Sequence, residues 1–349
     1  MLSIRENVPL GPMTTLGVGG PARYFVEATT IDEVSEGLEF ARSKKLPLFV
    51  LGGGSNLVVS DAGWPGVVLR VAVGGIERIE AGDRVRLKVG AGECWDRFVA
   101  RSISENCAGV ECLSGIPGSV GGTPVQNVGA YGQEVAETID CVLAVNVDDG
   151  GLQELSRADC RFSYRASIFN TTEKGRYVIV QVTYALSPNS SPRLAYADLK
   201  KHFVGWNELP TLADVREAVR KIRASKGMLI TPGEQDCRSA GSFFKNPVIS
   251  PEQYADLTAR AQLKRLEVPS YPALEAQRKV SAAWLVEHSG YGKGFSSGGV
   301  GISRKHALAI VNLGEATAAQ VIDLKDHIQD RVERIWGIRL DPEPVMVGF

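Results

Sequence analysis

The sequence predicts an α+β protein of two or three domains, and three observations support this class. The chain has 349 residues, which is too long for one compact core. Its 38 glycines exceed the usual share and cluster beside apolar residues, at 17–20, 52–54, 115–122, 129–132 and 290–301. Strand-like segments prevail up to about residue 211, after which helical spacing recurs. We therefore expect a β-rich N-terminal two-thirds and a smaller α+β C-terminal domain.

The β-rich part combines short strands with one early helix. Residues 31–43 have helical spacing, and Thr30 is suited to cap the first turn. Apolar runs and the alternation of polar with apolar residues predict strands at 46–51, 84–92 and 177–186. Two further runs on either side of an Asp-Gly turn predict a hairpin at 141–155.

Amphipathic helices are predicted for the C-terminal part. From residue 211 apolar residues recur on one stripe, and Thr211 and Asp214 have the spacing of a capping box. Further helical patterns lie at 251–264, 277–288 and 317–336. Gly290 and Gly337 are placed to end the last two of these helices.

Composition excludes several classes of partner. Lys+Arg (39) and Asp+Glu (40) nearly cancel, so no basic surplus points to nucleic acid and no acidic tail points to a disordered partner segment. The first residues, MLSIRENVPL, lack the apolar stretch of a signal peptide, and no run approaches the length of a membrane span. We expect a cytoplasmic protein that binds neither membrane nor nucleic acid.

The cysteine pattern predicts no metal site. None of the 6 cysteines forms a C-x-x-C pair, and the 4 histidines do not cluster with them at zinc-finger spacing. We expect most of these cysteines to be buried thiols in a reducing compartment.

The segment LGGGSNLVVS (51–60) follows a predicted strand and is suited to hold a pyrophosphate. Its glycines, with Ser55 and Asn56, offer backbone N–H groups and side-chain donors. A Rossmann loop would open a helix, and a P-loop would continue with Gly-Lys-Ser/Thr. Here the chain continues as strand and turn, so a dinucleotide would be bound by loops that connect strands.

Residues 114–135, SGIPGSVGGTPVQNVGAYGQEV, form a second unusual segment. It carries no charge before Glu134, although it is rich in glycine and contains the amides Gln126 and Asn127. An ordinary surface loop usually carries charges, so we interpret this segment as one buried against an extended, partly aromatic ligand. The alternative is a long ordered surface loop.

Four residues stand out as candidates for substrate chemistry, each with a structural alternative. Arg165, between aromatic and small residues in FSYRASIF, could bind a carboxylate or pair with a structural acid. Glu343, in the proline-stiffened LDPEPV, could be a buried carboxylate with a raised pKa or a solvated tail residue. Lys226 and Tyr196 could bind phosphate, or could be a helix-end lysine and a core tyrosine.

Ser242 lies in SAGSFFKNP (239–247), between small residues and two phenylalanines. The simplest interpretation is a tight turn before a core strand. The segment lacks the G-x-S-x-G pattern of a hydrolase, and the nearest histidines, which could act as a base, are 40 or more positions away in sequence. A serine beside a lysine and apolar walls could instead donate a proton.

With these segments identified, the sequence resembles the UDP-N-acetylenolpyruvoylglucosamine reductase family (MurB) of bacterial peptidoglycan synthesis, in the longer of its two subtypes. The resemblance covers nearly the whole chain in family order. It rests on TTLGVGGPA, LGGGSNLVV, GIPGSVGGTPVQNVGAYGQE, YRASIF, SAGSFFKNP, AAWLVEHSGYGKG and LDPEP. At Val345 some members have an arginine and at His306 one common form has glutamine, so the resemblance is incomplete there.

The resemblance implies an FAD-binding fold of the vanillyl-alcohol-oxidase (PCMH) type, made of two α+β subdomains, with a third α+β domain for substrate. The first subdomain would span 1–70, the second 71–224 and the substrate domain 225–337. The tail 338–349 would pack back near the active site.

The resemblance also implies the reaction and its residues. NADPH would reduce bound FAD, and the enolpyruvyl ether of UDP-N-acetylglucosamine would then accept a hydride at its methylene carbon and a proton at the adjacent carbon. Ser242 matches the proton donor, and Arg165 and Glu343 match the residues that stabilise the enolic intermediate. The residues implied to contact substrate or NADPH are Tyr164, Tyr196, Lys226, Asn246 and His306. Those implied to bind FAD are Gly52, Gly53, Gly54, Ser55, Asn56, Leu57, Pro117, Gly118, Ser119, Gly121, Gly122, Gln126, Asn127, Gly129, Ala130 and Arg223.

Three alternatives remain open at the level of the sequence. A related flavin oxidoreductase of the same fold could act on another hydroxy or enol acid. Ser242 could serve a hydrolase or an acyl transferase, or the chain could bind flavin without turnover. We expect a monomer in each case.

Overall fold

The structure is a computed structural model that describes residues 2–273 and 276–349. The chain forms two compact units, each assembled from segments that are not contiguous in sequence. Unit 1 contains the residues up to Val8, Ala22–Gly54 and Trp64–Ser225. Unit 2 contains Pro9–Pro21, Ser55–Gly63 and Lys226–Phe349. The glycine loop at 51–60 therefore begins in one unit and ends in the other.

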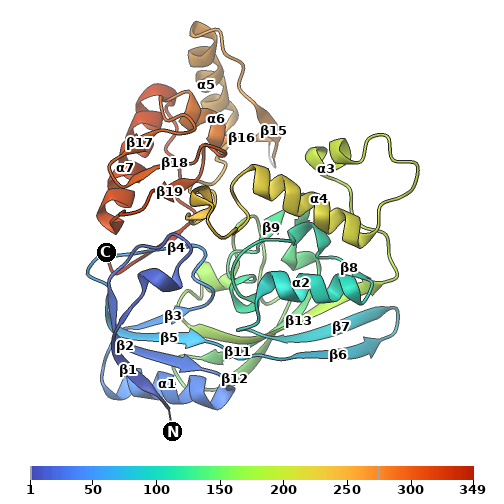
Figure 1. Cartoon of the computed structure of the whole chain (residues 1–349), viewed down its shortest axis with the longest axis vertical. Helices are drawn as coiled ribbons and strands as arrows, with labels where there is room; N and C mark the ends of the chain where they lie inside the picture. The colour runs from blue at the N-terminus through green and yellow to red at the C-terminus, as the bar shows by residue number, and fades with distance from the viewer. Residues whose placement is uncertain (1, 274–275) are drawn as a thin grey trace. The chain divides into compact units, whose positions relative to one another are not determined.

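The first sheet of unit 1 contains parallel pairs. Its strands run in the order β1-β2-β5-β3, with bounds Ile4–Pro9, Pro21–Ala28, Trp64–Val71 and Leu48–Leu51. β5 pairs in parallel with both β2 and β3. Helix α1 (Ile31–Ser43) buries Val34 and Leu38 in the same core as these strands (Figure 1). Thr30 caps α1 by accepting a hydrogen bond from the backbone N–H of Glu33 at 3.1 Å, so the predicted helix and its cap are confirmed.

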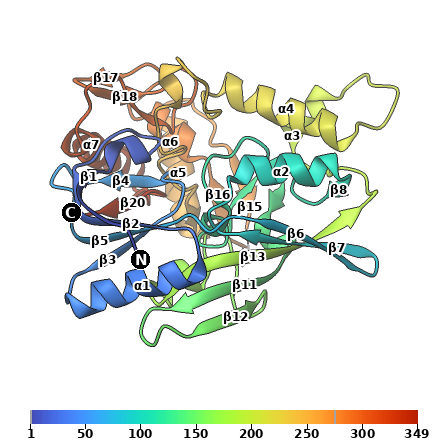
Figure 2. The ribbon, with the colours of Figure 1, turned by 60° about the horizontal axis from the view of Figure 1, so that its bottom comes forward.

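The second sheet of unit 1 is antiparallel (Figure 2). Its strands run in the order β12-β11-β13-β7-β6, with bounds Leu152–Ser156, Ile139–Asn146, Tyr177–Pro188, Arg84–Gly90 and Ile76–Ala81. The short β8 (Cys107–Ala108) pairs with the end of β13. In β7, Val85, Leu87 and Val89 are buried while the intervening residues face outward, which is the alternation that predicts this strand. The predicted hairpin is the pair β11 and β12.

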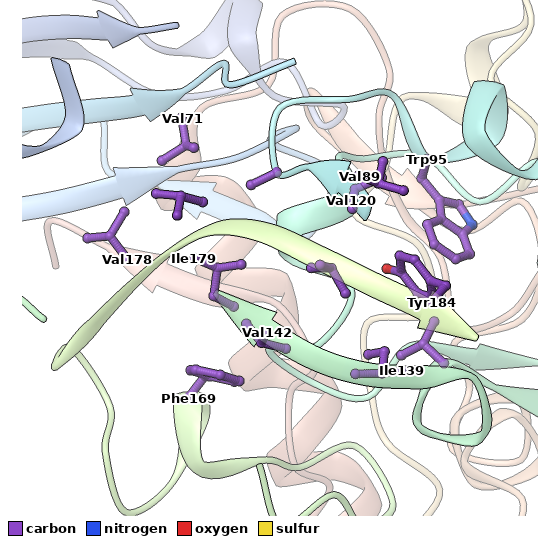
Figure 3. Packing of buried hydrophobic residues seen from close by; sticks show 14 of the residues in the cluster. Val71, Val89, Trp95, Val120, Ile139, Val142, Phe169, Val178, Ile179 and Tyr184 are labelled. Atoms are coloured by element: carbon purple, nitrogen blue, oxygen red, sulfur yellow. The ribbon is translucent and has the colours of Figure 1, made fainter. Parts of the chain in front are cut away.

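An aromatic cluster joins this sheet to the helix that follows β7 in sequence (Figure 3). Tyr184 of β13 packs against Trp95 and Phe98 of α2 (Trp95–Ser104), with ring centroids 5.8 and 4.7 Å away. The Tyr184 hydroxyl shares a 2.7 Å hydrogen bond with the Thr123 hydroxyl. The indole N–H of Trp95 donates to the carbonyl of Leu113 at 3.0 Å. These contacts attach the first part of the uncharged segment 114–135, hereafter the neutral segment, to the core.

Two further helices belong to unit 1. α3 spans Ala197–His202 and α4 spans Leu212–Ser225. Thr211 and Asp214 exchange hydrogen bonds of 3.2 and 2.8 Å with each other's backbone N–H, which confirms the predicted cap. Arg216 and Arg220 of α4 both bind Asp96 of α2, and the carboxylate of Asp96 also accepts the N–H of Gly115 at 2.6 Å. Asp96 thus ties α2, α4 and the neutral segment together.

Unit 2 packs helices beside short strands around its own core. Its helices are α5 (Pro251–Leu263), α6 (Ala282–Glu287) and α7 (Ala318–Trp336). β14, β16 and β15 pair antiparallel, with bounds Val248–Ile249, Arg278–Val280 and Ser270–Pro272. β17, β18 and β19 do likewise, with bounds Ser296–Ser297, Val300–Ile302 and Ile310–Asn312. β4 (Leu57–Val59) pairs in parallel with β20 (Val345–Val347) near the C-terminus.

One predicted helix begins later than its apolar pattern indicates. The sequence predicts a helix over 277–288, but residues 278–280 form β16, and α6 begins only at Ala282. Strand pairing occupies the backbone groups of β16, and the Ser281 hydroxyl accepts from the N–H of Trp284 at 3.3 Å to start the helix there. Gly337 ends α7 in the left-handed conformation at φ 71°, as predicted.

The structure also bears on the cysteines and on the membrane. All six cysteines are free thiols, and Cys107, Cys112, Cys160 and Cys237 are buried. Burial raises the pKa of Cys160 to about 12, so its thiol is protonated and unreactive at neutral pH.

Within the described residues, no helix is both long and apolar enough to cross a bilayer.

Candidate active site

In unit 1 the two glycine loops predicted to bind a cofactor lie against each other. A Cβ on Gly53 would lie 2.5 Å from the Cα of Gly118, and a Cβ on Gly52 would lie 2.8 Å from the hydroxyl oxygen of Ser119. A Cβ on Gly121 would lie 2.6 Å from the Cβ of Ala91. Only glycine fits at these positions, and at Gly53 the neighbouring atom is itself backbone. The remaining predicted members of these loops in unit 1 are Gly54, Pro117, Gly122, Gln126, Asn127, Gly129 and Ala130.

The neutral segment ends in a tight hairpin held by Asn127. Strands β9 (Gly129–Ala130) and β10 (Gln133–Glu134) pair antiparallel. The buried amide of Asn127 donates to Glu134 at 2.7 Å and to the carbonyl of Ser163 at 3.0 Å, and it accepts from the N–H of Ala136 at 3.1 Å. Because its donors and acceptor serve these protein contacts, a cofactor contact of Asn127 would come from its backbone.

Arg165 lies beside this hairpin. Its guanidinium donates to the carbonyl of Gly129 at 3.2 Å and lies 5.4 Å from the ring centre of Tyr164. Its backbone is left-handed at φ 56°, and the amide of Asn170 donates to its carbonyl at 3.1 Å. The half-buried Arg165 is therefore positioned by both its main chain and its side chain. The structure brings Gly129 next to Tyr164 and Arg165, although 36 positions separate Gly129 from Arg165 in sequence.

Arg223 of α4 is buried beneath the same part of unit 1. Its Nε–H donates to the carbonyl of Gly115 at 3.0 Å. Burial lowers the pKa of this guanidinium, while the neighbouring Tyr131 and Asp96 favour its charged form. The ring of Tyr131 meets that of Tyr196 edge-on, with centroids 5.4 Å apart. Sequence reasoning missed Tyr131, although its place between Ala130 and Gly132 in the neutral segment was an available signal.

In unit 2, Ser242 lies next to the segment that carries Glu343. The N–H of Glu343 donates to the carbonyl of Phe243 at 2.9 Å, and the N–H of Lys245 donates to that of Asp341 at the same distance. Gly241 supplies the left-handed turn before the serine at φ 78°, and nothing lies within 4 Å of where its Cβ would be, so the predicted tight turn is confirmed. Phe243 is fully buried, but the predicted core strand is wrong. Phe244 makes only an isolated bridge with Pro342, because the pairing with the Glu343 segment does not extend into a ladder.

Asn56 holds the other side of the Glu343 segment. Its amide donates to the carbonyl of Glu343 at 3.1 Å, and its carbonyl accepts from the N–H of Val345 at 2.9 Å. Leu57 continues this pairing as the first residue of β4. The Thr15 hydroxyl lies 3.3 Å from the carbonyl of Ser55 and 2.6 Å from that of Ser239. The second half of the glycine loop is therefore attached to both the Ser242 and the Glu343 segments.

Among the residues that the structure describes, His306 is the titratable group that hydrogen-bonds the Ser242 hydroxyl. Its Nε2 lies 3.0 Å from the serine Oγ, although 64 positions separate the two in sequence. Burial, with the charges of Lys226 and Lys293, lowers the pKa of His306 to about 4. The imidazole is therefore neutral at physiological pH. In the described part of the chain no carboxylate hydrogen-bonds this ring, so the pair lacks the acid of a hydrolase triad.

The turn that carries His306 is fixed by buried polar groups. The Ser303 hydroxyl accepts from the N–H of Lys305 at 3.0 Å and of His306 at 3.2 Å. Asp236 accepts from the backbone N–H of Arg304 at 2.8 Å and from its guanidinium. These hydrogen bonds, with one from Ser303, outweigh burial and lower the pKa of Asp236. Nothing in the sequence patterns singled out Asp236, Ser303 or Lys293.

Asn246 has a contact that stabilises unit 2. Its side-chain carbonyl accepts from the N–H of Ala282 at 2.9 Å, at the first turn of α6.

The predicted site residues fall into two groups, one in each unit. Unit 1 holds Arg165, Tyr164, Tyr196, Arg223 and the first glycine loop with the neutral segment. Unit 2 holds Ser242, Glu343, His306, Lys226, Asn246 and the second half of the glycine loop.

Comparison with known proteins gives two family matches and several full-length relatives. A model described as an FAD binding domain matches residues 22–156, and one described as the C-terminal domain of UDP-N-acetylenolpyruvoylglucosamine reductase matches residues 232–347. The UDP-N-acetylenolpyruvoylglucosamine reductase of Thermobifida fusca (strain YX) is 45% identical, covering 99% of this chain and 98% of that protein. That of Streptomyces coelicolor is 42% identical, covering 98% and 90%. The chain belongs to the UDP-N-acetylenolpyruvoylglucosamine reductase (MurB) family.

A solved MurB structure supports the same assignment. The crystal structure of UDP-N-acetylenolpyruvylglucosamine reductase (MurB) from Thermus caldophilus has a TM-score of 0.67 to this chain, with 26% sequence identity. The similarity covers 99% of this chain and 100% of that one. Together with the FAD binding domain, this confirms the predicted α+β flavin-binding fold. The chain is a flavin-dependent oxidoreductase of the MurB family, so a hydrolase or acyl transferase is no longer a competing class.

The residues present in unit 1 fit an FAD-binding role. The glycine loops there bring uncharged backbone close together, and Gly122 has no atom nearer than the Ser119 hydroxyl, at 4.0 Å, on the side where a Cβ would point. Glycine-rich backbone N–H groups suit a pyrophosphate, and an open glycine face suits a planar ring. The buried cation of Arg223 lies beside the same segment.

Proposed function

We propose that this chain catalyses the NADPH-dependent reduction of UDP-N-acetylglucosamine enolpyruvate to UDP-N-acetylmuramate. The observation that carries the proposal is the similarity of 45% identity over 99% of the chain to a UDP-N-acetylenolpyruvoylglucosamine reductase. FAD, when bound, accepts a hydride from NADPH and delivers one to the enolpyruvyl group. The product would be a precursor of peptidoglycan, needed for the cell wall and through it for cell shape and division.

Ser242 is the residue that we propose as proton donor. Reduction of the enol ether leaves negative charge on the carbon next to the substrate carboxylate, and this carbon must receive a proton. A serine hydroxyl has a high pKa, so it donates only to a strongly basic centre of this kind. The buried Phe243 and Phe244 beside it would keep water away from that centre.

Arg165 and Glu343 are proposed to stabilise the enolic intermediate. A fixed guanidinium can bind the substrate carboxylate through two parallel hydrogen bonds, which strengthen as negative charge builds. Its attachment to the Gly129 carbonyl supports such a fixed position. Glu343 is supported as a partner of Ser242 by the backbone pairing between Phe243 and Glu343.

The remaining site assignments stay proposals in the same scheme. We propose that FAD is bound by Gly52–Leu57, by Pro117, Gly118, Ser119, Gly121, Gly122, Gln126, Asn127, Gly129 and Ala130, and by Arg223. Tyr164, Tyr196, Lys226, Asn246 and His306 are proposed to contact the sugar nucleotide or NADPH. For the domains, we retain 1–70 and 71–224 as FAD-binding subdomains, 225–337 as the substrate domain and 338–349 as a tail near the active site. We also propose a cytoplasmic monomer.

An absorbance spectrum and a coupled assay test the proposal. Purified protein should be yellow and should oxidise NADPH only when UDP-N-acetylglucosamine enolpyruvate is present. Colourless protein, or yellow protein that uses a different hydroxy or enol acid in its place, would contradict the proposal. Flavin that NADPH fails to bleach in a stopped-flow experiment would instead indicate a binding module without turnover.

A further inference from the structure

The hydrogen bond between Ser242 and His306 raises a question that the proposed function leaves open. A hydroxyl has one proton. In the 3.0 Å contact, either the serine O–H donates to Nε2 or an Nε2–H donates to the serine oxygen. If the serine donates to the imidazole, its proton points at His306 and not at the substrate. If the imidazole donates, the serine O–H remains available. The direction of this one hydrogen bond therefore decides whether Ser242 can act as proton donor.

The surroundings of His306 favour a ring that stays neutral. The ring is largely buried, and the charged groups that act on it are the ammonium groups of Lys226 and Lys293. On its own turn, Arg304 is paired with Asp236 and Lys305 with Glu234, so these charges are balanced locally. An imidazole that took the serine proton would become a third cation among two lysines. This arrangement opposes the use of His306 as a base for a serine nucleophile.

Hydrogen bonds fix the turn that carries the His306 ring. The backbone N–H of His306 donates to the hydroxyl of Ser303, which is also bound to Asp236. Both Ser303 and Asp236 are buried, at 0% and 2% exposure. A Cβ on Gly227 would lie 3.0 Å from the Cβ of Asp236, which places the residue after Lys226 against the same group. The backbone that carries the ring is thus fixed by several contacts within unit 2, and the 3.0 Å contact of Nε2 with Ser242 Oγ sets the ring beside the serine.

We propose that His306 is a positioning residue for proton transfer, in which its Nε2–H donates to Ser242 Oγ and directs the serine proton to the substrate. This inference rests on the proposed function. In the step, the Ser242 O–H bond breaks and a C–H bond forms at the carbon next to the substrate carboxylate. The electron pair of the O–H bond stays on Oγ, where the Nε2–H stabilises the alkoxide. The serine regains a proton from water after the product leaves, and the imidazole keeps its proton throughout.

Stopped-flow kinetics on the FAD-loaded protein test this role with three variants. His306→Ala removes the donor, His306→Gln keeps an amide N–H near the place of Nε2, and the exposed His327→Gln on α7 is the control. Loss of one such donor should slow flavin reoxidation by saturating UDP-N-acetylglucosamine enolpyruvate about 100-fold in His306→Ala. Reoxidation in His306→Gln should stay within about ten-fold of the parent protein. Both half-reactions should be unchanged in His327→Gln, and the flavin absorbance of each purified variant shows whether it is folded and loaded with FAD.

Two further measurements separate this role from a plain substrate contact. Imidazole ¹⁵N chemical shifts of the parent protein should show His306 protonated at Nε2, and the opposite tautomer would overturn the inference. Normal reoxidation of His306→Ala at saturating substrate, with only weaker substrate binding, would also overturn it. If the parent protein itself is not reoxidised by this substrate, the proposed function fails. If the parent protein is reoxidised by this substrate and the His306→Ala variant is unaffected, the inference about His306 fails and the proposed function stands.

Discussion

Ser242 shows how the setting of one hydroxyl limits what it can do. Gly241 provides the left-handed turn before it, Phe243 behind it is fully buried, and His306 binds its oxygen. A serine nucleophile needs a base that can accept its proton, whereas this imidazole is kept neutral by burial and by two lysines. The same hydroxyl is suited to give a proton to a strongly basic carbon.

Replacing Ser242 by alanine should affect one half of the proposed reaction. We expect Ser242→Ala to be reduced by NADPH at a nearly normal rate and to be reoxidised by the enolpyruvyl substrate about 10² to 10⁴ times more slowly, because general acid catalysis is lost. Stopped-flow absorbance of the flavin measures both rates. Equal loss in both half-reactions would mean that Ser242 is structural.

The pKa of His306 predicts a pH dependence of stability. In the folded protein this pKa is about 4, below its ordinary value of 6.5, so between these values the unfolded chain binds a proton that the folded chain does not. The free energy of unfolding should therefore fall as pH drops through this window, by up to about 3 kcal/mol, with no contribution from His306 above it. His306→Gln should lose this part of the pH dependence.

Urea unfolding at several pH values measures this effect. The stability difference between the parent protein and His306→Gln should shrink as pH falls from 6.5 toward 4, and His327→Gln should show no comparable trend since His327 is exposed. A parent-to-variant difference that stays constant with pH would contradict the predicted state of His306.

At the scale of elements, the glycine loops of unit 1 depend on close backbone approach. The loop after β3 meets Gly118 and Ser119 at distances that exclude a Cβ. α2, α4 and the neutral segment are joined by Asp96, which binds Arg216, Arg220 and the N–H of Gly115. Helices and loops thus position the candidate flavin-binding segment as one assembly within unit 1.

Gly53→Ala tests the contact between the loops. The added Cβ would lie 2.5 Å from backbone of the opposite loop, which cannot move as a flexible side chain can. We expect a loss of about 1–3 kcal/mol in the free energy of unfolding, as for other overpacked sites, and a lower FAD content per protein. Gly292→Ala is the matched control, since nothing lies within 4 Å of its Cβ position. Full FAD content and an unchanged melting temperature in Gly53→Ala would refute the prediction.

At the scale of the whole molecule, the two units are interleaved along the chain. Unit 2 takes Pro9–Pro21 and Ser55–Gly63 from the N-terminal third, and its buried core includes Leu16, Val18 and Val58. β4 from the second of these segments pairs with β20 near the C-terminus. Neither unit is therefore a continuous piece of sequence.

This interleaving predicts how a fragment behaves. Residues 226–349 expressed alone lack β4 and part of the unit 2 core, so we expect no cooperative thermal unfolding and a weak near-UV circular dichroism signal. The full chain is the control, and mixing with a fragment of residues 1–225 should restore a cooperative transition. Cooperative melting of 226–349 alone would show that the two N-terminal segments are dispensable.

The sequence alone determined the class of fold and most elements. The sequence predicted the caps at Thr30 and Thr211 and the alternation of β7 correctly. These features depend on residues only a few positions apart, so the sequence alone is enough to show them. The local signal failed at 277–281, where pairing with β14 and β15 prevails over helical spacing. The glycine loops predicted close approach of backbone to a pyrophosphate or an extended ligand, and the family resemblance identified that ligand as flavin.

Only the tertiary structure decided which residues meet. The contact between Ser242 and His306 spans 64 positions, and that between the Asn56 amide and Glu343 spans 287. No periodicity or capping rule encodes such pairs, because they depend on how turns and strands of one unit pack. For the same reason the neutral state of His306 could not be predicted: burial and the charges of Lys226 and Lys293 exist only in the folded chain.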